Sequence, residues 1–540
     1  MKKILFFLLI SNYIFAQWSI SNAERSALMS LYNSTNGEHW STVWDFQKDP
    51  KTWYGIKIKN GFVTEINLRG NALKGNFPAN LSVFSHLEKL DFSSNQLQGE
   101  ISQELSSLSY LVRLDVSNNR LSGDPSAAVS SLAQLKELSL GDNNFSVADI
   151  EAFLQNFSQL EILNLAHFGL TSVPVKISLN QRLQSLNLSN NNISQNFQTL
   201  SGLVTLSEIN LSGNQLTAIP SGLPNTVKSL DISNNLFSNN YSAALSNLKN
   251  LEWLSLENNQ INTFPSELSQ LTKLVHLNFG RNTISGGTST LLSLSGLQQL
   301  FLNNNLFSGD FPADLLQLPQ LQMLSLSSNQ LSGNIPQNIP AVTFIENNRF
   351  TEVQIRNFLD NAEQRADFVY SPQRYDEEKT IEAYITGPAN LTQSLSGSDY
   401  TYTWLKALDQ NIDVHTPNYY ISSVQAKDYD VYTCEAYFLK NYPNYLLEIS
   451  FFREPITLLE TMGTEEATKN INIYPNPTKD YLHIRTENMK MDNATIYDFS
   501  GKLLFTTKKN IIDVRHLPSG VYAITIETRN GRKIFKWIKE

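Results

Sequence analysis

The chain is poor in cysteine, in charge of one sign and in long hydrophobic runs. Cys434 is the single cysteine in 540 residues, which excludes an intrachain disulfide and any metal cage built from several cysteines. Lysine and arginine number 41 against 50 acidic residues, a net charge of −9, which argues against a general nucleic-acid binder. The charge balance therefore predicts no nucleic-acid partner. No run of apolar residues is long enough to span a bilayer, so we expect no transmembrane segment.

The remaining composition is that of folded domains. Hydrophobic residues make up 41% of the chain and the 24 glycines add about 4%, which reaches the low edge of the ordinary globular range and excludes disorder over the full length. A length of 540 residues predicts about three or four domains rather than one core.

The first residues are typical of an export signal. Lys2 and Lys3 precede an apolar run at residues 4–10, and the small Ala16 stands before Gln17. This pattern predicts a secretory signal peptide over residues 1–16, with a buried N-terminal helix as the alternative. We therefore expect the mature chain outside the cytoplasm, held together by packing and backbone pairing alone.

The strongest pattern is a leucine repeat. The motif L-x-x-L-x-L-x-x-N-x-L recurs about twelve times over residues 63–350, with a degenerate further copy and a spacing of about 23–24 residues. It matches the leucine-rich-repeat signature, and its Gly-x-Ile/Phe-Pro turns resemble the subtype of plant receptor ectodomains and some bacterial surface proteins. Each L-x-L segment predicts a short strand that pairs in parallel with the next, giving a curved sheet with short helices or turns on the convex side.

One asparagine per repeat is expected to satisfy buried backbone groups where the chain leaves the strand. The column comprises Asn71, Asn95, Asn119, Asn143, Asn191, Asn214, Asn235, Asn259, Asn282, Asn305, Asn329 and Asn348. Phe168 interrupts it, which predicts a local irregularity. Shortly before this gap, Ser146 followed by Asp149 predicts the start of a helix on the convex side.

Both ends of the repeat array predict caps. Residues 17–62 contain a capping box, Ser21 with Glu24, and resemble the N-terminal caps of such arrays. Four aromatic residues are expected to cover the core of the first repeat: Trp40, Trp44, Trp53 and Tyr54. Residues 351–369, which begin with a second capping box at Thr351, predict a helix that closes the other end.

Residues 370–458 predict a small β-sandwich, because aromatic and β-branched residues alternate between turns. The stretch D-x-D-x-Y-x-C ending at Cys434 resembles immunoglobulin-type sandwiches, in which a tyrosine two residues before the cysteine anchors a corner, and Trp404 stands where such domains keep a core tryptophan. The partner cysteine is missing; Ala383 is our prediction for its place. Cys434 is then expected to be a buried thiol. Another type of sandwich is the alternative.

The C-terminal part resembles an export tag. Residues 459–470 form a polar linker, and residues 471–540 contain the segments INIYPNP, ATIYDFSGK and LPSGVY in order. They resemble the type A C-terminal sorting domain of type IX secretion substrates. The resemblance implies recognition by the type IX machinery, passage across the outer membrane, removal of this domain, and surface anchoring or release. A further adhesive β-domain is the alternative.

Catalytic motifs are missing from the sequence. It has no P-loop, dinucleotide fingerprint, H-E-x-x-H or G-x-S-x-G segment, so we expect no enzyme activity, no metal and no cofactor. Asp91 and Asp115 are expected to be neighbours on adjacent strands, a spacing that a paired-carboxylate glycosidase could use. A solvated repeat face explains the two aspartates better.

The outward residues of the strands predict a binding surface. Most are small and polar, but large side chains cluster on four consecutive repeats. The predicted ligand-binding patch comprises Trp253, His276, Phe301 and Met323, with Glu257 and Arg281 beside it. Packing against a later domain of the same chain is the alternative.

The expected fold class is therefore an α/β leucine-rich-repeat solenoid followed by two small all-β sandwich domains. The leading functional hypothesis is a secreted or cell-surface binding protein for an extracellular protein or glycan, found on the outer-membrane exterior after removal of both export signals. An extracellular hydrolase with an unrecognised active site, or a stalk without a ligand, are the alternatives.

Overall fold

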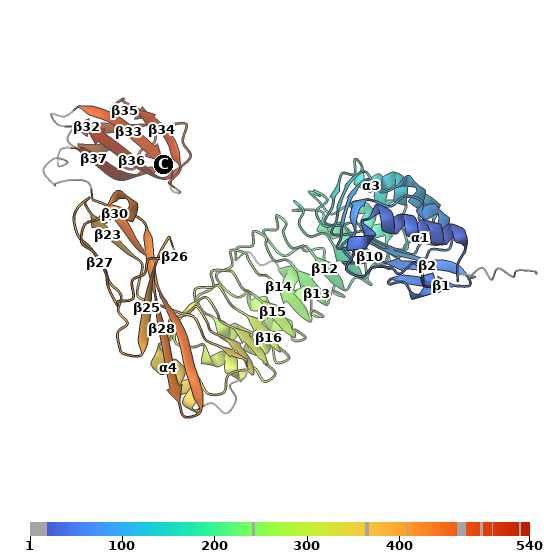
Figure 1. The fold of residues 1–540 in the computed structure, drawn as a ribbon, viewed down its shortest axis with the longest axis horizontal. Coiled ribbons are helices and arrows are strands. Elements are labelled where there is room, and N and C mark those ends of the chain that lie inside the picture. The colour runs from blue at the N-terminus through green and yellow to red at the C-terminus, as the bar shows by residue number, and fades with distance from the viewer. Residues whose placement is uncertain are drawn as a thin grey trace, which may run out of the picture. The chain divides into compact units, whose positions relative to one another are not determined.

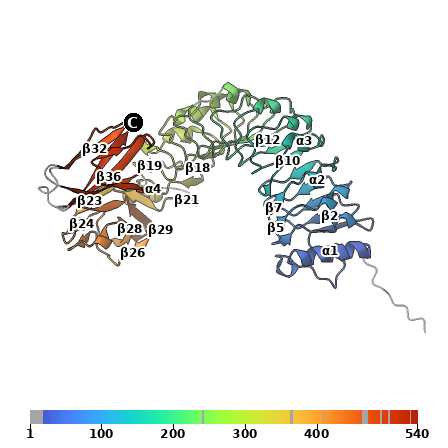
Figure 2. The same ribbon diagram turned by 90° about the horizontal axis from the view of Figure 1, so that it is seen from above.

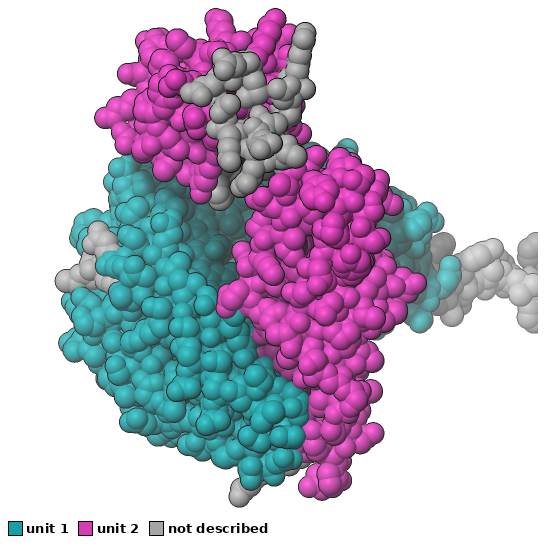
Figure 3. Space-filling view, turned by 90° about the vertical axis from the view of Figure 1, so that its left-hand side faces the viewer, with its two compact units in different colours: residues 1–370 teal, residues 371–540 magenta. Residues whose placement is uncertain are grey.

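A computed structural model shows two compact units, residues 1–370 and 371–540 (Figures 1 and 3). The structure describes residues 19–239, 243–361, 367–407, 409–461, 471–486, 490–498, 501–528 and 531–540. The predicted signal peptide at residues 1–16 and most of the predicted linker at 459–470 lie outside the described residues. Among the helices that are described, none combines the length and the apolar content of a membrane span.

The first unit is built on one 15-stranded sheet, and its strands follow one another in chain order along an arc (Figure 2). Apart from the antiparallel pair β1–β2, neighbouring strands pair in parallel. The strands are β1 (Ile56–Lys59), β2 (Phe62–Asn67), β4 (Lys89–Asp91), β6 (Arg113–Asp115), β8 (Glu137–Ser139), β10 (Ile162–Asn164), β11 (Ser185–Asn187), β12 (Glu208–Asn210), β13 (Ser229–Asp231), β14 (Trp253–Ser255), β15 (His276–Asn278), β16 (Gln299–Phe301), β18 (Met323–Ser325), β20 (Val342–Phe344) and β21 (Phe368–Val369). The predicted repeat solenoid is confirmed.

Short strands and helices form the rest of each turn. Two further parallel sheets are β3 (Lys74–Asn76), β5 (Gln96–Gly99), β7 (Arg120–Gly123) and β9 (Asn144–Phe145), and β17 (Ser308–Gly309) with β19 (Gln330–Leu331). The α-helices are α1 (Asn22–Ser34), α2 (Ser126–Val129), α3 (Ile150–Leu154) and α4 (Glu352–Asn361). The 3-10 helices are η1 (Gly37–His39), η2 (Pro50–Thr52), η3 (Leu81–Val83), η4 (Gln103–Ser107), η5 (Val175–Leu179), η6 (Phe197–Leu200), η7 (Ala243–Asn247), η8 (Ser266–Gln270), η9 (Thr288–Ser293) and η10 (Ala313–Gln317).

The repeat leucines and asparagines hold the turns together. The central residue of the repeat strands, a leucine in most of them, is buried, as Leu277 and Leu300 show with no exposed surface. Asn282 shows what the asparagine column does: its amide donates to the carbonyls of Leu256, Phe279 and Gly280, each at 3.0 Å, and its Oδ1 accepts the N–H of Ile261 at 3.0 Å. Each asparagine thus joins its own turn to the preceding one.

The interruption at Phe168 changes this bonding locally. Asn191, the next asparagine of the column, accepts the N–H groups of both Phe168 and Leu170 at 2.9 and 3.0 Å. The predicted convex-side helix is present as α3, but its N-cap is Asp149, which accepts from Ala152, and the assignment of Ser146 to that role was wrong. The reason is that Asp149 itself has extended backbone angles, so its side chain can accept the free N–H groups of Glu151 and Ala152.

The N-terminal segment covers the first repeat. Trp40, Trp44 and Trp53 are buried as predicted, whereas Tyr54 is 46% exposed and only its carbonyl contributes, by accepting Trp44 Nε1 at 2.9 Å. The Glu24 carboxylate, itself buried, accepts the N–H of Val63 at 3.0 Å and thereby ties α1 to β2.

The C-terminal end of the array has its own cap. At the start of α4 the Gln354 side chain accepts the N–H of Thr351 at 2.8 Å, and Thr351 Oγ1 accepts the N–H of Gln354 at 3.4 Å. The helix buries Ile355, Phe358 and Leu359, and Phe358 contacts Phe368 with ring centroids 4.6 Å apart. Phe368 belongs to the short strand β21, which pairs with β20 at the end of the main sheet.

The second unit begins with two facing sheets. One contains β22 (Gln373–Tyr375), β23 (Lys379–Ala383), β25 (Tyr400–Lys406), β26 (Gln410–Asn411), β28 (Val431–Tyr442), β29 (Tyr445–Arg453) and β30 (Ile456–Glu460), and the other contains β24 (Ala389–Leu391) and β27 (Tyr419–Ile421), with η11 (Ala426–Asp428) between β27 and β28. Trp404 and Cys434 are directly opposite on β25 and β28, and both are fully buried. Tyr432 Oη donates to the Asp428 carbonyl at 2.5 Å, a contact of the same kind as the tyrosine corner of immunoglobulin-type sandwiches.

The prediction for the missing partner of Cys434 was wrong. Ala383 lies on β23, which pairs with β30 in the same sheet as Cys434, so it cannot face that residue from the opposite sheet. The buried residues of the opposing sheet are Ala389 and Leu391 on β24 and Ile421 on β27. The sequence motif around Cys434 fixed one sheet, but nothing local marked which strand lies across the core.

The C-terminal part of the second unit is also all-β. It contains a three-stranded sheet of β31 (Ile471–Tyr474), β32 (Tyr481–Thr486) and β35 (Ile511–Asp513), and a four-stranded sheet of β33 (Met491–Tyr497), β34 (Leu503–Thr507), β36 (Gly520–Thr528) and β37 (Gly531–Lys539). Trp537, fully buried and stacked on Tyr522 with ring centroids 5.0 Å apart, lies in the core formed by the two sheets.

Candidate functional site

The strand register brings the predicted patch together. In the first outward column Trp253 is beside His276, then Gln299, then Met323, on the neighbouring strands β14, β15, β16 and β18. Phe301 is the second outward residue of β16. We call Trp253, His276, Phe301 and Met323 the aromatic patch; each is partly exposed.

The rings of the aromatic patch contact one another. His276 stacks on Trp253, with ring centroids 4.9 Å apart and planes 13° apart, and its other neighbour Phe301 is at 5.2 Å and 39°. Because Gln299 Oε1 can only accept, the 2.9 Å contact means that His276 Nδ1 donates to it. Burial lowers the pKa of His276 below its ordinary value, against the opposing effect of the bond to Gln299. The imidazole is therefore neutral at pH 7, and the patch presents an uncharged face.

A surface ion pair lies at the edge of the aromatic patch. Arg281 Nε is 3.4 Å from Glu257 Oε1, and the Asn278 amide donates to Glu257 Oε2 at 3.0 Å. The Arg281 side chain is 63% exposed, so this pair contributes little to stability, and it leaves a polar rim beside the rings.

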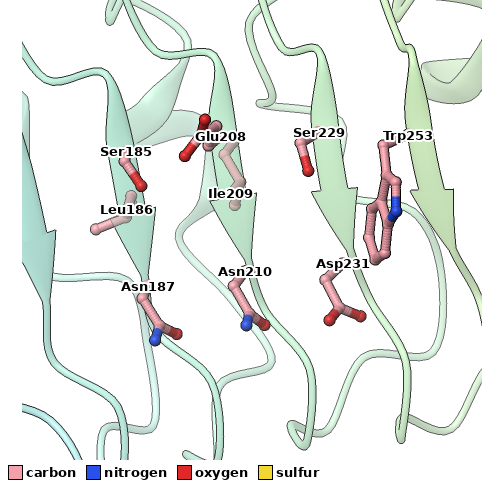
Figure 4. A pocket seen from close by; sticks show the side chains of 9 residues that line it. All are labelled: Ser185, Leu186, Asn187, Glu208, Ile209, Asn210, Ser229, Asp231 and Trp253. Carbon is pink, nitrogen blue, oxygen red and sulfur yellow. The ribbon is translucent and has the colours of Figure 1, made fainter.

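A shallow pocket of about 340 Å³ opens on the other side of Trp253 (Figure 4). Its lining comes from β11 to β14: Ser185, Leu186, Asn187, Glu208, Ile209, Asn210, Ser229, Asp231 and Trp253. Trp253 was predicted from the sequence as part of a site, whereas Glu208 and Asp231 were not. Both carboxylates stand in the outward columns one or two repeats before Trp253, and that spacing is the signal that could have found them.

Most polar residues of the second outward column also serve the backbone. Oδ1 of Asn187, Asn210 and Asp231 accepts the N–H two residues later, at 3.0, 2.9 and 3.0 Å. This turn-forming role explains why Asn and Asp recur at this position. It occupies one end of each side chain and leaves the other end toward the pocket.

The adjacent aspartates considered as a glycosidase pair are held in an ion network. Arg113 Nη2 is 3.1 Å from Asp91 Oδ2 and 3.8 Å from Asp115 Oδ2, and Oδ1 of each aspartate accepts from the hydroxyl of the serine two residues on. Burial raises the pKa of Asp115, with a further contribution from the Asp91 charge. Both carboxylates are buried and occupied, so this arrangement offers no open acid–base pair.

The described part of the chain also contains no group of three or more His, Cys, Asp or Glu side chains placed to hold a metal ion.

Family models match two parts of the chain. The secretion system C-terminal sorting domain matches residues 472–540, and leucine-rich-repeat models match residues 225–284 and five further segments at 86–108, 110–132, 182–203, 205–226 and 320–341. The chain therefore carries leucine-rich repeats and a type IX sorting domain, and it is a secreted or cell-surface protein. The resemblances to leucine-rich repeats and to the sorting domain are confirmed.

Individual relatives match the repeats. Receptor-like protein 18 of Arabidopsis thaliana is 35% identical over 184 residues, which is 29% of this chain and 22% of that protein. The chain spans less than a quarter of the length of the curated relatives it matches. An internalin of Listeria monocytogenes is 28% identical over 51% of this chain and 87% of its own, with a TM-score of 0.41. The ectodomain of the Arabidopsis thaliana receptor kinase GASSHO1/SCHENGEN3 is 26% identical over 57% of this chain and 41% of its own, with a TM-score of 0.44.

Proposed function

We propose that this leucine-rich-repeat protein with a type IX sorting domain is a binding protein that recognises an extracellular protein or glycan through its aromatic patch. The observation that carries the proposal is the continuity of partly exposed Trp253, His276, Phe301 and Met323 on four neighbouring strands. Apolar surface left in water is unfavourable by about 25 cal/mol per Å². Large side chains grouped on an otherwise small and polar face are typical of an interaction site.

The proposal includes the absence of a catalytic role. The adjacent carboxylates that favoured a hydrolase in the sequence are bound to Arg113 and to neighbouring serines. The proposal also includes the fate of the chain: removal of residues 1–16 and of the sorting domain leaves the repeats and the sandwich at the cell surface or in the medium.

The experiment is a screen of the full chain on a glycan array and against a random-peptide display library. Trp253→Ala and Phe301→Ala are expected to lower the affinity for hits at least tenfold, since each removes a ring of the aromatic patch. Tyr110→Ala is the matched control, because Tyr110 is 59% exposed and lies outside the patch. Hits whose affinity is unchanged by both patch variants place the binding site elsewhere.

The same variants separate ligand binding from packing within the chain. If Trp253→Ala lowers the thermal stability of the free protein but leaves every hit intact, the patch serves an internal contact. A full chain that gives no hit on either platform favours the stalk alternative.

A further inference from the structure

The pocket beside Trp253 has an open aromatic wall. The strand register places Trp253 between His276 on β15 and Ser229 on β13. His276 covers one face of the indole, with planes 13° apart. The other face is directed to the pocket, where the ring lies next to Ser229 and Asp231 (Figure 4). A flat ligand group can therefore stack on Trp253 only from the side of β13.

The pocket also carries two carboxylates without a cation. Glu208 and Asp231 both line it, and no lysine or arginine does. Neither carboxylate has an ion-pair partner in the part of the chain that the structure describes. Nearby acids differ in this respect, because Glu252 pairs with Lys228 at 3.0 Å and Glu257 with Arg281 at 3.4 Å.

Both carboxylates have an oxygen that can accept a hydrogen bond from a ligand. Asp231 uses Oδ1 for the N–H of Ser233 at 3.0 Å, so Oδ2 remains to accept from a ligand. Glu208 is exposed on the neighbouring strand and supplies a second acceptor. An arginine or lysine cation over an indole gains about 0.5–2 kcal/mol, and charge-assisted bonds to carboxylates add to it. A neutral sugar would leave both negative charges unmatched, and an acidic group would be repelled.

We propose that this pocket binds the side chain of a basic residue, arginine above all, presented by an extended segment of a protein ligand. The inference rests on the proposed binding function and names its ligand class. Arginine is favoured over lysine because its planar guanidinium can stack on Trp253 while its N–H groups donate to Asp231, and the negative charge of Glu208 on the neighbouring strand adds to the attraction. Ser229 and the amides of Asn187 and Asn210 can bind the backbone of the same segment.

The test selects 12-residue peptides against the full chain from a random display library. Enriched sequences are expected to share an arginine or a lysine. A synthetic copy in which citrulline replaces that arginine is expected to bind at least tenfold more weakly, because citrulline keeps the shape but loses the charge. Binding of the arginine peptide is also expected to weaken as the salt concentration rises from 0.05 to 0.5 M.

A charge-neutral variant locates the effect. Glu208→Gln combined with Asp231→Asn is expected to reduce the affinity at least tenfold and to fold normally, because asparagine already occupies the same column position at residues 187 and 210 and forms the same turn. The control is Glu65→Gln with Glu161→Gln, which changes the net charge equally but lies outside the pocket. The control is expected to bind like the wild type.

The outcomes separate this inference from the proposed function. The inference is overturned, and the proposed function kept, if peptide hits depend on Trp253 but bind equally well with citrulline and to the charge-neutral variant. Glycan hits that depend on Trp253 but not on the two carboxylates have the same meaning. Hits that are insensitive to Trp253→Ala and to the charge-neutral variant overturn both. A library that enriches no peptide above background also counts against the inference.

Discussion

Arg113 donates to Asp91 across two adjacent strands, with 3.1 Å between Nη2 and Oδ2. The same guanidinium is 3.2 Å from Glu137 and 3.8 Å from Asp115, so one cation serves three carboxylates on β4, β6 and β8. Burial raises the pKa of Asp115 and of Glu137, although Arg113 acts in the opposite direction on both. The network therefore holds three carboxylates around one guanidinium, and Lys89 adds a second positive charge that acts on Glu137.

Arg113→Ala is predicted to destabilise the first unit by about 1–3 kcal/mol at pH 7, because three partly or fully buried carboxylates lose their partner. A raised pKa in the folded state gives stability that is complete below the ordinary value near pH 4 and is lost as the pH rises through the folded value. The variant should therefore lose more stability between pH 4 and pH 7 than the wild type does.

The measurement for this network is the midpoint of urea unfolding at pH 4 and at pH 7, with circular dichroism as the probe. Arg120→Ala on the same repeat is the control, because Arg120 is exposed and belongs to no ion pair among the described residues. Equal losses for Arg113→Ala at both pH values would contradict the electrostatic account.

The asparagine column gives a second prediction. Asn282→Ala should lower the free energy of unfolding by about 1–3 kcal/mol, since the N–H of Ile261 loses its acceptor in a buried turn and three carbonyls each lose one of two donors. Asn282→Asp should be worse than alanine, because it keeps the acceptor but places a negative charge against three carbonyl oxygens. Asn225→Ala, an exposed asparagine outside the column, should change the urea midpoint little. An aspartate that is tolerated better than alanine would contradict this role.

Most of the fold of the first unit could be predicted from the repeat period. A fixed spacing of leucines determines which residues face inward, so each repeat's strand and its register followed from the sequence. Where the period gives no signal, the prediction failed or said nothing. The two-residue strand β21 was not foreseen, and the pattern of Ser146 followed by Asp149 placed the start of the helix too early.

The candidate site was predictable in outline only. Its columns follow from strand alternation, which placed Trp253 and its aromatic neighbours together. Glu257 has a cation beside it, whereas Glu208 and Asp231 have none. This difference depends on the positions of the charged ends of the lysine and arginine side chains. Residue spacing does not encode that distance, so the pocket emerged only from the structure.

A third prediction concerns the thiol of Cys434. Burial raises the pKa of this thiol to about 11, so it is protonated at neutral pH. The side chain also has no exposed surface. It should not react with Ellman's reagent in the folded chain at pH 8 and should react with a stoichiometry of one in 6 M guanidinium chloride. Reaction of the native protein within minutes would show that the sandwich opens or that the thiol is activated.

The fourth prediction follows from the neutral state of His276. Its ordinary pKa is about 6.5, and burial between Trp253 and Phe301 lowers it in the folded chain. Between the two values the unfolded chain binds more protons, so the contribution of His276 to stability is complete above about pH 6.5 and is lost as the pH falls toward the folded value. Acidification should therefore cost the wild type more stability in this window than His276→Phe, which keeps a ring in the stack but cannot titrate. The difference between the two urea midpoints, measured from pH 7.5 to pH 5, isolates this one group from the carboxylates around Arg113, whose effects are common to both proteins. A difference that stays constant over this range would mean that the imidazole is as free to take up a proton in the folded chain as in water.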